Sequence, residues 1–209
     1  MAVIRHEARG AARKPGGAAR RHAQAVLYFQ EGTQEKFMTI QLRHETPDDV
    51  AAIEAVTVAA FAEAPHTSHT EQFIVRALRA ANELTLSIVA EEQGQVVGHV
   101  ALSPVTITDG HGHKAAGWYG LGPISVLPQR QGQGIGSRLM EQALAELRAM
   151  HAAGCVLLGD PAYYARFGFQ THTGLQLPGV PPGYFMALAF DGPVPEGIAY
   201  YSDAFNAAA

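Results

Sequence analysis

The segment LPQRQGQGIGSRLM, residues 127–140, places Gly132, Gly134 and Gly136 at alternate positions, and an apolar helical pattern begins directly after them. Successive backbone N–H groups at such a loop-to-helix junction point into one concavity, where the helix dipole favours an anion. Glycines let the backbone approach a ligand closely and adopt positive φ angles. The segment therefore predicts a phosphate-binding loop.

The glycine spacing separates the possible phosphate ligands. The dinucleotide fingerprint G-x-G-x-x-G, counted from Gly132 and Gly134, needs a third glycine at 137, but the chain has Ser137. The nucleoside-triphosphate loop G-x-x-x-x-G-K-[ST] needs a lysine, and this segment contains none. A nucleotide-binding protein of another fold is therefore kept only as the weaker alternative.

Other reactive side chains give weaker signals. The only cysteine, Cys155, lies in the apolar run GCVLLG with no base nearby in sequence, so we expect a buried, unreactive thiol. Asp160 precedes Pro161 and is expected to cap a helix. Neither His66 with His69 nor His111 with His113 has a third ligand at a recognisable spacing, so we expect no metal site.

The elements around the loop follow from hydrophobic periodicity and turn residues. We predict strands at 39–45, 84–92, 95–108, 115–127, 155–159, 183–190 and 197–205, and helices at 47–61, 71–81, 134–151 and 161–167. The apolar residues of the third helix that should face inward are Leu139, Met140, Ala143, Leu144, Leu147 and Met150.

The crossover over 115–159 must pair parallel strands within a mainly antiparallel sheet. The expected fold class is therefore α/β (α+β), with a mixed central sheet and helices on both faces. The glycine loop should lie at the carboxyl end of the first crossover strand, where such sheets place ligands.

Composition divides the chain into a basic N-terminal segment and one acidic domain. Residues 1–37 contain seven Arg or Lys and three Glu, and the remainder contains eight basic and sixteen acidic residues. We expect 1–37 to be a basic, disordered extension and 38–209 to be the functional domain. The negative charge of the domain argues against binding to nucleic acid. No apolar run is long enough to span a membrane. A chain with a single cysteine is expected in the cytoplasm.

Two ordered motifs carry a family resemblance. The pattern Q/R-x-x-G-x-G/A is matched by Gln129, Gly132 and Gly134, and Y-x-x-x-G-F is matched by Tyr164, Gly168 and Phe169. The chain resembles the Gcn5-related N-acetyltransferase (GNAT) superfamily here, and the order of elements over 39–205 is similar to that of the superfamily. The segment GDPAYYARFGF resembles most the bacterial YhbS-like branch of the superfamily.

The resemblance implies acetyl-CoA as cosubstrate. Its pyrophosphate would contact the loop residues Gln129, Arg130, Gln131, Gly132, Gln133, Gly134, Ile135, Gly136 and Ser137, and Arg138 could add a positive charge. Its pantetheine arm would bind a bulged strand at Ile124, Ser125 and Val126, with an N–H near Val126 polarising the thioester carbonyl. Tyr164 would protonate the departing thiolate, while Tyr163 is expected to be a core aromatic.

The resemblance also implies that a neutral primary amine of a small molecule or peptide attacks the acetyl group directly. The sequence does not single out the general base, for which Glu71, Glu91, Glu92 and His99 are the candidates. A CoA-binding regulatory module of the same fold is the first alternative. The superfamily's last strands often pair subunits, so a homodimer is also an expectation.

Overall fold

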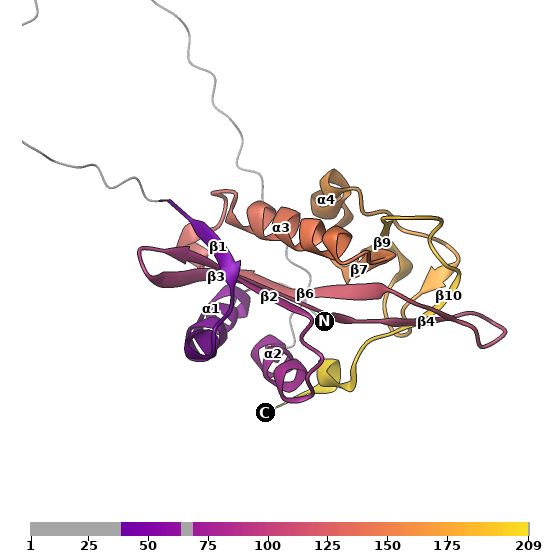
Figure 1. The fold of residues 1–209 in the computed structure, drawn as a ribbon, viewed down its shortest axis with the longest axis horizontal. Coiled ribbons are helices and arrows are strands. Elements are labelled where there is room, and N and C mark those ends of the chain that lie inside the picture. Colours follow the sequence, from indigo (N-terminus) through magenta and orange to yellow (C-terminus); the bar gives the residue numbers. More distant parts are fainter. Residues whose placement is uncertain (1–38, 64–68, 209) are drawn as a thin grey trace, which may run out of the picture.

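The computed structural model describes residues 39–63 and 69–208, and its largest unit is a six-stranded sheet (Figure 1). The strand order is β1-β2-β3-β6-β7-β9, and only β6 and β7 run parallel. The bounds are β1 Gln41–His44, β2 Leu86–Glu92, β3 Gln95–Pro104, β6 Trp118–Val126, β7 Gly154–Leu158 and β9 Phe185–Ala189. The predicted mixed, mainly antiparallel sheet is confirmed.

Helices cover both faces of this sheet (Figure 1). On one face lie α1 (Val50–Phe61) and α2 (Glu71–Ala80), and on the other lie α3 (Ile135–Ala149) and the short α4 (Pro161–Tyr164). Alternate residues of a strand point to opposite faces. Val100 and Leu102 of β3 therefore pack in the cluster that includes α3, whereas Ala101 packs against Ile53 of α1 and Val75 of α2.

A second, four-stranded sheet has the order β5-β4-β10-β8. Its strands are β5 Lys114–Ala115, β4 Thr106–Thr108, β10 Gly197–Tyr200 and β8 Leu175–Gln176. The predicted strand 95–108 is thus divided between two sheets. The predicted strand 197–205 was too long, because Ser202 accepts a 3.0 Å hydrogen bond from the N–H of Ala204 and begins the 3-10 turn η5 (Asp203–Asn206).

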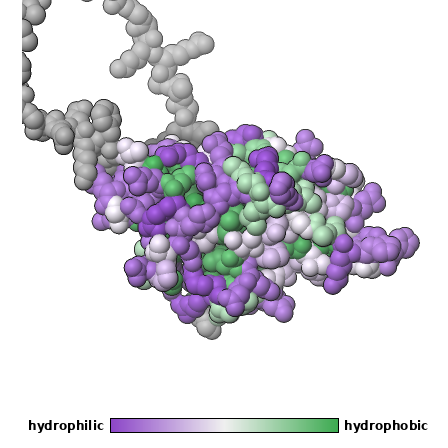
Figure 2. Space-filling view, in the orientation of Figure 1, coloured by the Kyte–Doolittle hydropathy of each residue, from purple (hydrophilic) through white to green (hydrophobic). Residues whose placement is uncertain are grey.

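Two local predictions have opposite outcomes. Asp160 caps α4 as expected, accepting a 3.0 Å hydrogen bond from the N–H of Ala162. Met150 was wrongly predicted to face inward: α3 ends at Ala149, and Met150 is its exposed C-cap. Figure 2 shows hydrophilic residues over most of the visible surface, with hydrophobic residues gathered near the middle of that face.

The crossover strands β6 and β7 pair only at one end. Trp118, Tyr119 and Gly120 face Gly154, Cys155 and Val156, and beyond Gly120 the strand β6 has no register partner in β7. The register between β6 and β3 also shifts near Pro123, which has no N–H to donate to a ladder. The predicted interruption of β6 is confirmed. Beyond Gly120 the edge of β6 beside β7 is open.

The described residues place two limits on the remaining predictions. No helix in 39–63 or 69–208 is long and apolar enough to cross a membrane. The expected extension, residues 1–37, and His66 lie outside the described residues.

Candidate active site

The open edge of β6 presents backbone polar groups toward β7. The N–H of Leu127 donates a 2.9 Å hydrogen bond to the carbonyl of Val97 on β3. Backbone groups of successive strand residues point to opposite edges, so those of Val126 and Ile124 point away from β3. The N–H of Val126, which the family resemblance implies as an oxyanion donor, is thus directed away from β3.

Ser125 is placed differently from its two neighbours. Its position directly opposite His99 turns its backbone toward β3, and its side chain is 1% exposed. The Ser125 hydroxyl lies 3.4 Å from the Thr57 hydroxyl of α1. Of the three predicted pantetheine contacts, Ile124 and Val126 therefore have backbone groups at the open edge, and Ser125 does not.

The glycine loop follows β6 and begins α3, as predicted. Gly132 has a φ of +74° and Gly134 a φ of +82°, and a Cβ built at either position would meet no atom within 4 Å. The first backbone bond of the helix runs from the N–H of Arg138 to the carbonyl of Gly134, at 3.0 Å. The N–H groups of Ile135, Gly136 and Ser137 therefore have no partner within the helix.

Glutamine side chains hold this loop to the end of β6. Gln131 donates from Nε2 to the carbonyl of Val126 at 3.0 Å, and Gln133 donates to the carbonyl of Gln129 at 3.1 Å. These bonds fix the loop backbone against the strand end without using its N–H groups. A loop that is already ordered loses less entropy when it binds a ligand.

The two arginines near the loop already have partners. Arg130 forms an ion pair with the buried Glu92, with 2.5 Å between Nη2 and Oε2. Arg138 donates from Nη2 to the carbonyl of Ile40 at 2.9 Å. The positive charge of Arg130 is thus partly neutralised, whereas the partner of Arg138 is a neutral carbonyl.

A partly open cavity lies where β6 separates from β7. Side chains from both faces of the sheet meet in it, with Tyr164 from α4 and Glu71 from α2. Its described lining residues are Phe61, Glu71, Ile74, Leu121, Gly122, Pro123, Ile124, Leu158, Tyr164 and Phe205.

Tyr164 is 3% exposed, and its ring packs over Gly159 at the end of β7. Burial, together with the nearby Tyr163 and Asp160, raises the pKa of the Tyr164 phenol above its usual value. The phenol therefore stays protonated at neutral pH and can donate a proton. Tyr163 is half-buried in an edge-on contact with Tyr164, with 4.9 Å between ring centroids.

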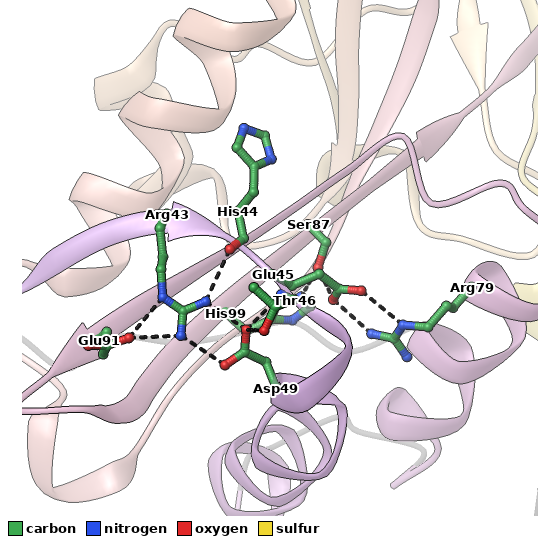
Figure 3. A network of polar contacts seen from close by, with 9 residues as sticks. All are labelled: Arg43, His44, Glu45, Thr46, Asp49, Arg79, Ser87, Glu91 and His99. Atoms are coloured by element: carbon green, nitrogen blue, oxygen red, sulfur yellow. Dashed lines mark hydrogen bonds and ion pairs between the residues drawn. The ribbon is translucent and has the colours of Figure 1, made fainter.

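The structure distinguishes among the four base candidates. Figure 3 shows Glu91 bound to Arg43 and His99 beside Ser87. Neither Glu91 nor His99 is among the described lining residues of the cavity. Burial lowers the pKa of His99 to about 4, so its imidazole is neutral at neutral pH. Glu92 pairs with Arg130, which leaves Glu71 as the one candidate that lines the cavity.

Other reactive groups lie outside this site. Cys155 is fully buried, and burial raises the pKa of its thiol, as expected of an unreactive cysteine. His111 and His113 are exposed in a turn, where Nδ1 of His113 lies 3.0 Å from the Asp109 carboxylate. Within 39–63 and 69–208 no group of three or more metal-ligating side chains is present.

Sequence reasoning missed the apolar walls of the cavity. Phe61 ends the predicted helix 47–61 and Phe205 ends the predicted strand 197–205, and neither residue was predicted to belong to the site. Neither position belongs to a motif, because both reach the site through the packing of distant segments. The available signal was the aromatic type of Phe205, three residues after Ser202, which caps η5.

Comparison with known proteins identifies the family. An acetyltransferase (GNAT) domain model matches residues 83–171, which include β6, the glycine loop, β7 and Tyr164. The N-acetyltransferase YhbS of Escherichia coli K12, itself uncharacterised, is 37% identical over 130 residues, which are 62% of this chain and 72% of YhbS. The chain belongs to the GNAT acetyltransferase family.

Two solved structures are similar along most of the chain. A GNAT family acetyltransferase from Brucella melitensis, in complex with acetyl-CoA, is 50% identical, with a TM-score of 0.71, 80% of this chain covered and 99% of that one. The YhbS structure from Escherichia coli, in complex with CoA, is 32% identical, with a TM-score of 0.72 and coverage of 84% and 97%. The predicted GNAT fold is confirmed.

Proposed function

We propose that this protein transfers the acetyl group of acetyl-CoA to a primary amine of a small molecule or peptide. The observation that carries the proposal is the open edge of β6, which runs from the cavity at Ile124 and Tyr164 to the glycine loop. The similar Brucella and Escherichia proteins bind acetyl-CoA and CoA, which supports the same ligand here. Residues 38–209 are the proposed acetyltransferase domain.

The glycine loop would bind the pyrophosphate of acetyl-CoA. The N–H groups of Ile135, Gly136 and Ser137 at the start of α3, together with the positive-φ backbone at Gly132 and Gly134, form its anion-binding surface. Gln129, Arg130, Gln131 and Gln133 would order or flank that surface. The pantetheine arm would lie along β6, where Ile124 and Val126 present backbone groups.

The reaction is a direct displacement at the thioester carbon. The nitrogen lone pair of the neutral amine attacks the acetyl carbon, and the N–H of Val126 stabilises the negative charge that develops on the carbonyl oxygen. As the C–N bond forms and the C–S bond breaks, the sulfur takes the bonding electron pair. Tyr164 then donates its phenolic proton to that thiolate and is reprotonated from solvent, while the nitrogen loses one proton to solvent as the amide forms.

The test measures binding and transfer separately. Acetyl-CoA at 100 times its Kd should stabilise the protein against unfolding by about 2.7 kcal/mol, whereas NAD and ATP should not. Release of free CoA thiol is then followed with a panel of amines, amino acids and N-terminal peptides. Stabilisation by acetyl-CoA without transfer to any amine would favour the regulatory CoA-binding module, and stabilisation by NAD or ATP instead would contradict the proposal.

A further inference from the structure

Arg166 is an exposed cation that is ordered by two aromatic rings. It lies in the 3-10 turn η3 (Ala165–Phe167), which directly follows α4. Its guanidinium carbon lies 3.9 Å from the centroid of the Tyr163 ring and 4.9 Å from that of the Phe167 ring. A guanidinium that stacks on rings uses its flat face, so the N–H groups at its edge stay available to an anion.

The Tyr163 ring joins this cation to the glycine loop. α3 and α4 lie on the same face of the sheet (Figure 1). A Cβ built at Gly136, in the first turn of α3, would lie 3.3 Å from the Tyr163 hydroxyl oxygen and 3.7 Å from Cγ2 of Val126. One ring therefore has its hydroxyl beside the start of α3 and its face against the Arg166 guanidinium.

Two positive groups are thus close together beside this ring. The N-terminus of α3 carries the positive end of the helix dipole and N–H groups without a partner in the helix. Arg166 adds a full positive charge, and within 39–63 and 69–208 it forms no ion pair with a carboxylate. Because like charges repel each other, an anion bound beside both groups would be attracted by each of them and would offset their repulsion.

CoA carries its negative charge in two places. The pyrophosphate joins the pantetheine arm to the ribose, and the ribose bears a separate 3′-phosphate, whereas the pantetheine arm is uncharged. In the proposed complex the first N–H groups of α3 bind the pyrophosphate and the arm runs along β6 to the cavity. The 3′-phosphate is then the anionic group that a cation outside the loop can bind, and the planar fork of an arginine matches a phosphate.

We propose, on the basis of the acetyl-CoA binding proposed above, that Arg166, stacked on Tyr163, binds the 3′-phosphate of acetyl-CoA. This contact distinguishes CoA from its 3′-dephospho form, which has the same pyrophosphate and the same pantetheine arm. Arg130 is less suited to the role, because it is already paired with the buried Glu92. Arg166 is therefore a specificity-determining residue for the cosubstrate.

The experiment measures, by calorimetry, the Kd of CoA and of 3′-dephospho-CoA for the full-length protein. The ratio of the two values isolates the contribution of the 3′-phosphate, because the ligands are otherwise identical. A charge-assisted contact between an arginine and a phosphate at an exposed site should make CoA bind about tenfold more tightly. Because the contact is exposed, this ratio should decrease as the salt concentration rises.

Matched variants test the arginine. Arg166→Gln removes the charge, and should reduce the ratio to about twofold or less by weakening CoA alone. Arg148→Gln is the control, because the Arg148 guanidinium lies 4.6 Å from the Phe190 ring centroid and belongs to the last turn of α3, at the opposite end from the loop. The control removes a similarly stacked charge and should leave the ratio unchanged.

Substitution of Tyr163 tests the stacked arrangement. Tyr163→Leu removes the ring that orders the guanidinium, and should reduce the ratio severalfold. Tyr163→Phe retains the ring without its hydroxyl and should preserve the ratio. Unfolding curves of each variant show that the compared proteins are folded. A ratio that is unchanged in folded Tyr163→Leu overturns the role of the stack.

The other outcomes separate this inference from the function on which it rests. Equal affinity of the wild type for the two ligands, or an unchanged ratio in Arg166→Gln, overturns the inference and leaves acetyl transfer intact. An equal weakening of both ligands in that variant also overturns it, because Arg166 would then act at the pyrophosphate. A ratio that is lost in Arg166→Gln supports the inference even if no amine is acetylated, a result that would contradict only the proposed transfer. A failure of both ligands to bind overturns the proposed function and this inference together.

Discussion

The ring of Tyr164 occupies the space where a side chain on Gly159 would lie. A Cβ at Gly159 would be 2.1 Å from Cε2 of Tyr164, so only glycine allows the ring this position at the end of β7. The same ring packs edge-on against Phe169, with 6.3 Å between centroids. The last residues of β7 and the Y-x-x-x-G-F motif thus act together to place one phenol in the cavity.

This contact predicts the effect of Gly159→Ala. The new methyl group should displace the Tyr164 ring, cost about 1–3 kcal/mol of unfolding free energy and lower kcat, while acetyl-CoA affinity changes little. Gly110→Ala is the control, because a Cβ at Gly110 meets no atom within 4 Å. Unfolding curves, kcat and calorimetric Kd check the prediction, and normal turnover in the Gly159 variant would contradict it.

Removal of the Tyr164 hydroxyl tests its chemical role directly. Tyr164→Phe retains the buried ring, so we expect stability and CoA affinity close to those of the wild type and a kcat lower by about 100-fold, the lower range for loss of a general acid. Because burial raises the pKa of this phenol, the wild type should show no loss of kcat from its ionisation up to pH 10. The pH profile of kcat and the variant's turnover are the measurements, and a fully active variant would remove Tyr164 from the mechanism.

Backbone conformation at Gly134 gives a prediction about the donor. Gly134→Val forces a β-branched residue into a φ of +82°, which costs about 1–2 kcal/mol and places a side chain in the phosphate loop. Gly94→Val imposes the same strain, at a φ of +83° in the turn between β2 and β3. Calorimetry should show CoA affinity at least tenfold weaker for Gly134→Val alone. Equal affinities of the two variants would mean that the loop does not contact the pyrophosphate.

The sequence predicted those structural features that depend on local residue patterns. The glycine loop, the start of α3 and the parallel crossover follow from turn residues and periodicity, and all lie where they were predicted. Glu71 could not be distinguished from Glu91 and Glu92 by residue type. Glu71 differs from them because each of the other two is held in an ion pair by an arginine distant in sequence. Arg43 pairs with Glu91, and Arg130 pairs with Glu92.

Long-range packing explains the remaining differences. Phe205 reaches the cavity because β10 ends early and η5 turns toward α2, and neither event has a signal in the periodicity of 197–205. Ser125 points at Thr57 because the bulge in β6 sets which residues of that strand face α1. The homodimer, which depends on a second chain, stays a prediction.

His99 links pH to stability. Burial lowers the pKa of its imidazole from 6.5 to about 4, and Nε2 lies 2.8 Å from the hydroxyl of Ser87, which in turn bonds Glu45 (Figure 3). Below pH 6.5 the unfolded chain binds a proton at this histidine and the folded chain does not, so stability falls as pH decreases toward 4. Between pH 7 and pH 5 we expect a loss of about 2 kcal/mol from this one group.

Urea unfolding at pH 7 and at pH 5 checks this prediction on the wild type and on His99→Phe. The variant loses the hydrogen bond to Ser87 and should be less stable than the wild type at pH 7. Its stability should nevertheless change less between the two pH values, because it lacks the titrating group. The chosen range stays above the ordinary pKa of Glu45, whose carboxylate is stabilised by Arg79 and Ser87 and affects stability only at lower pH. An equal pH dependence in both proteins would mean that His99 is already accessible to protons in the folded state.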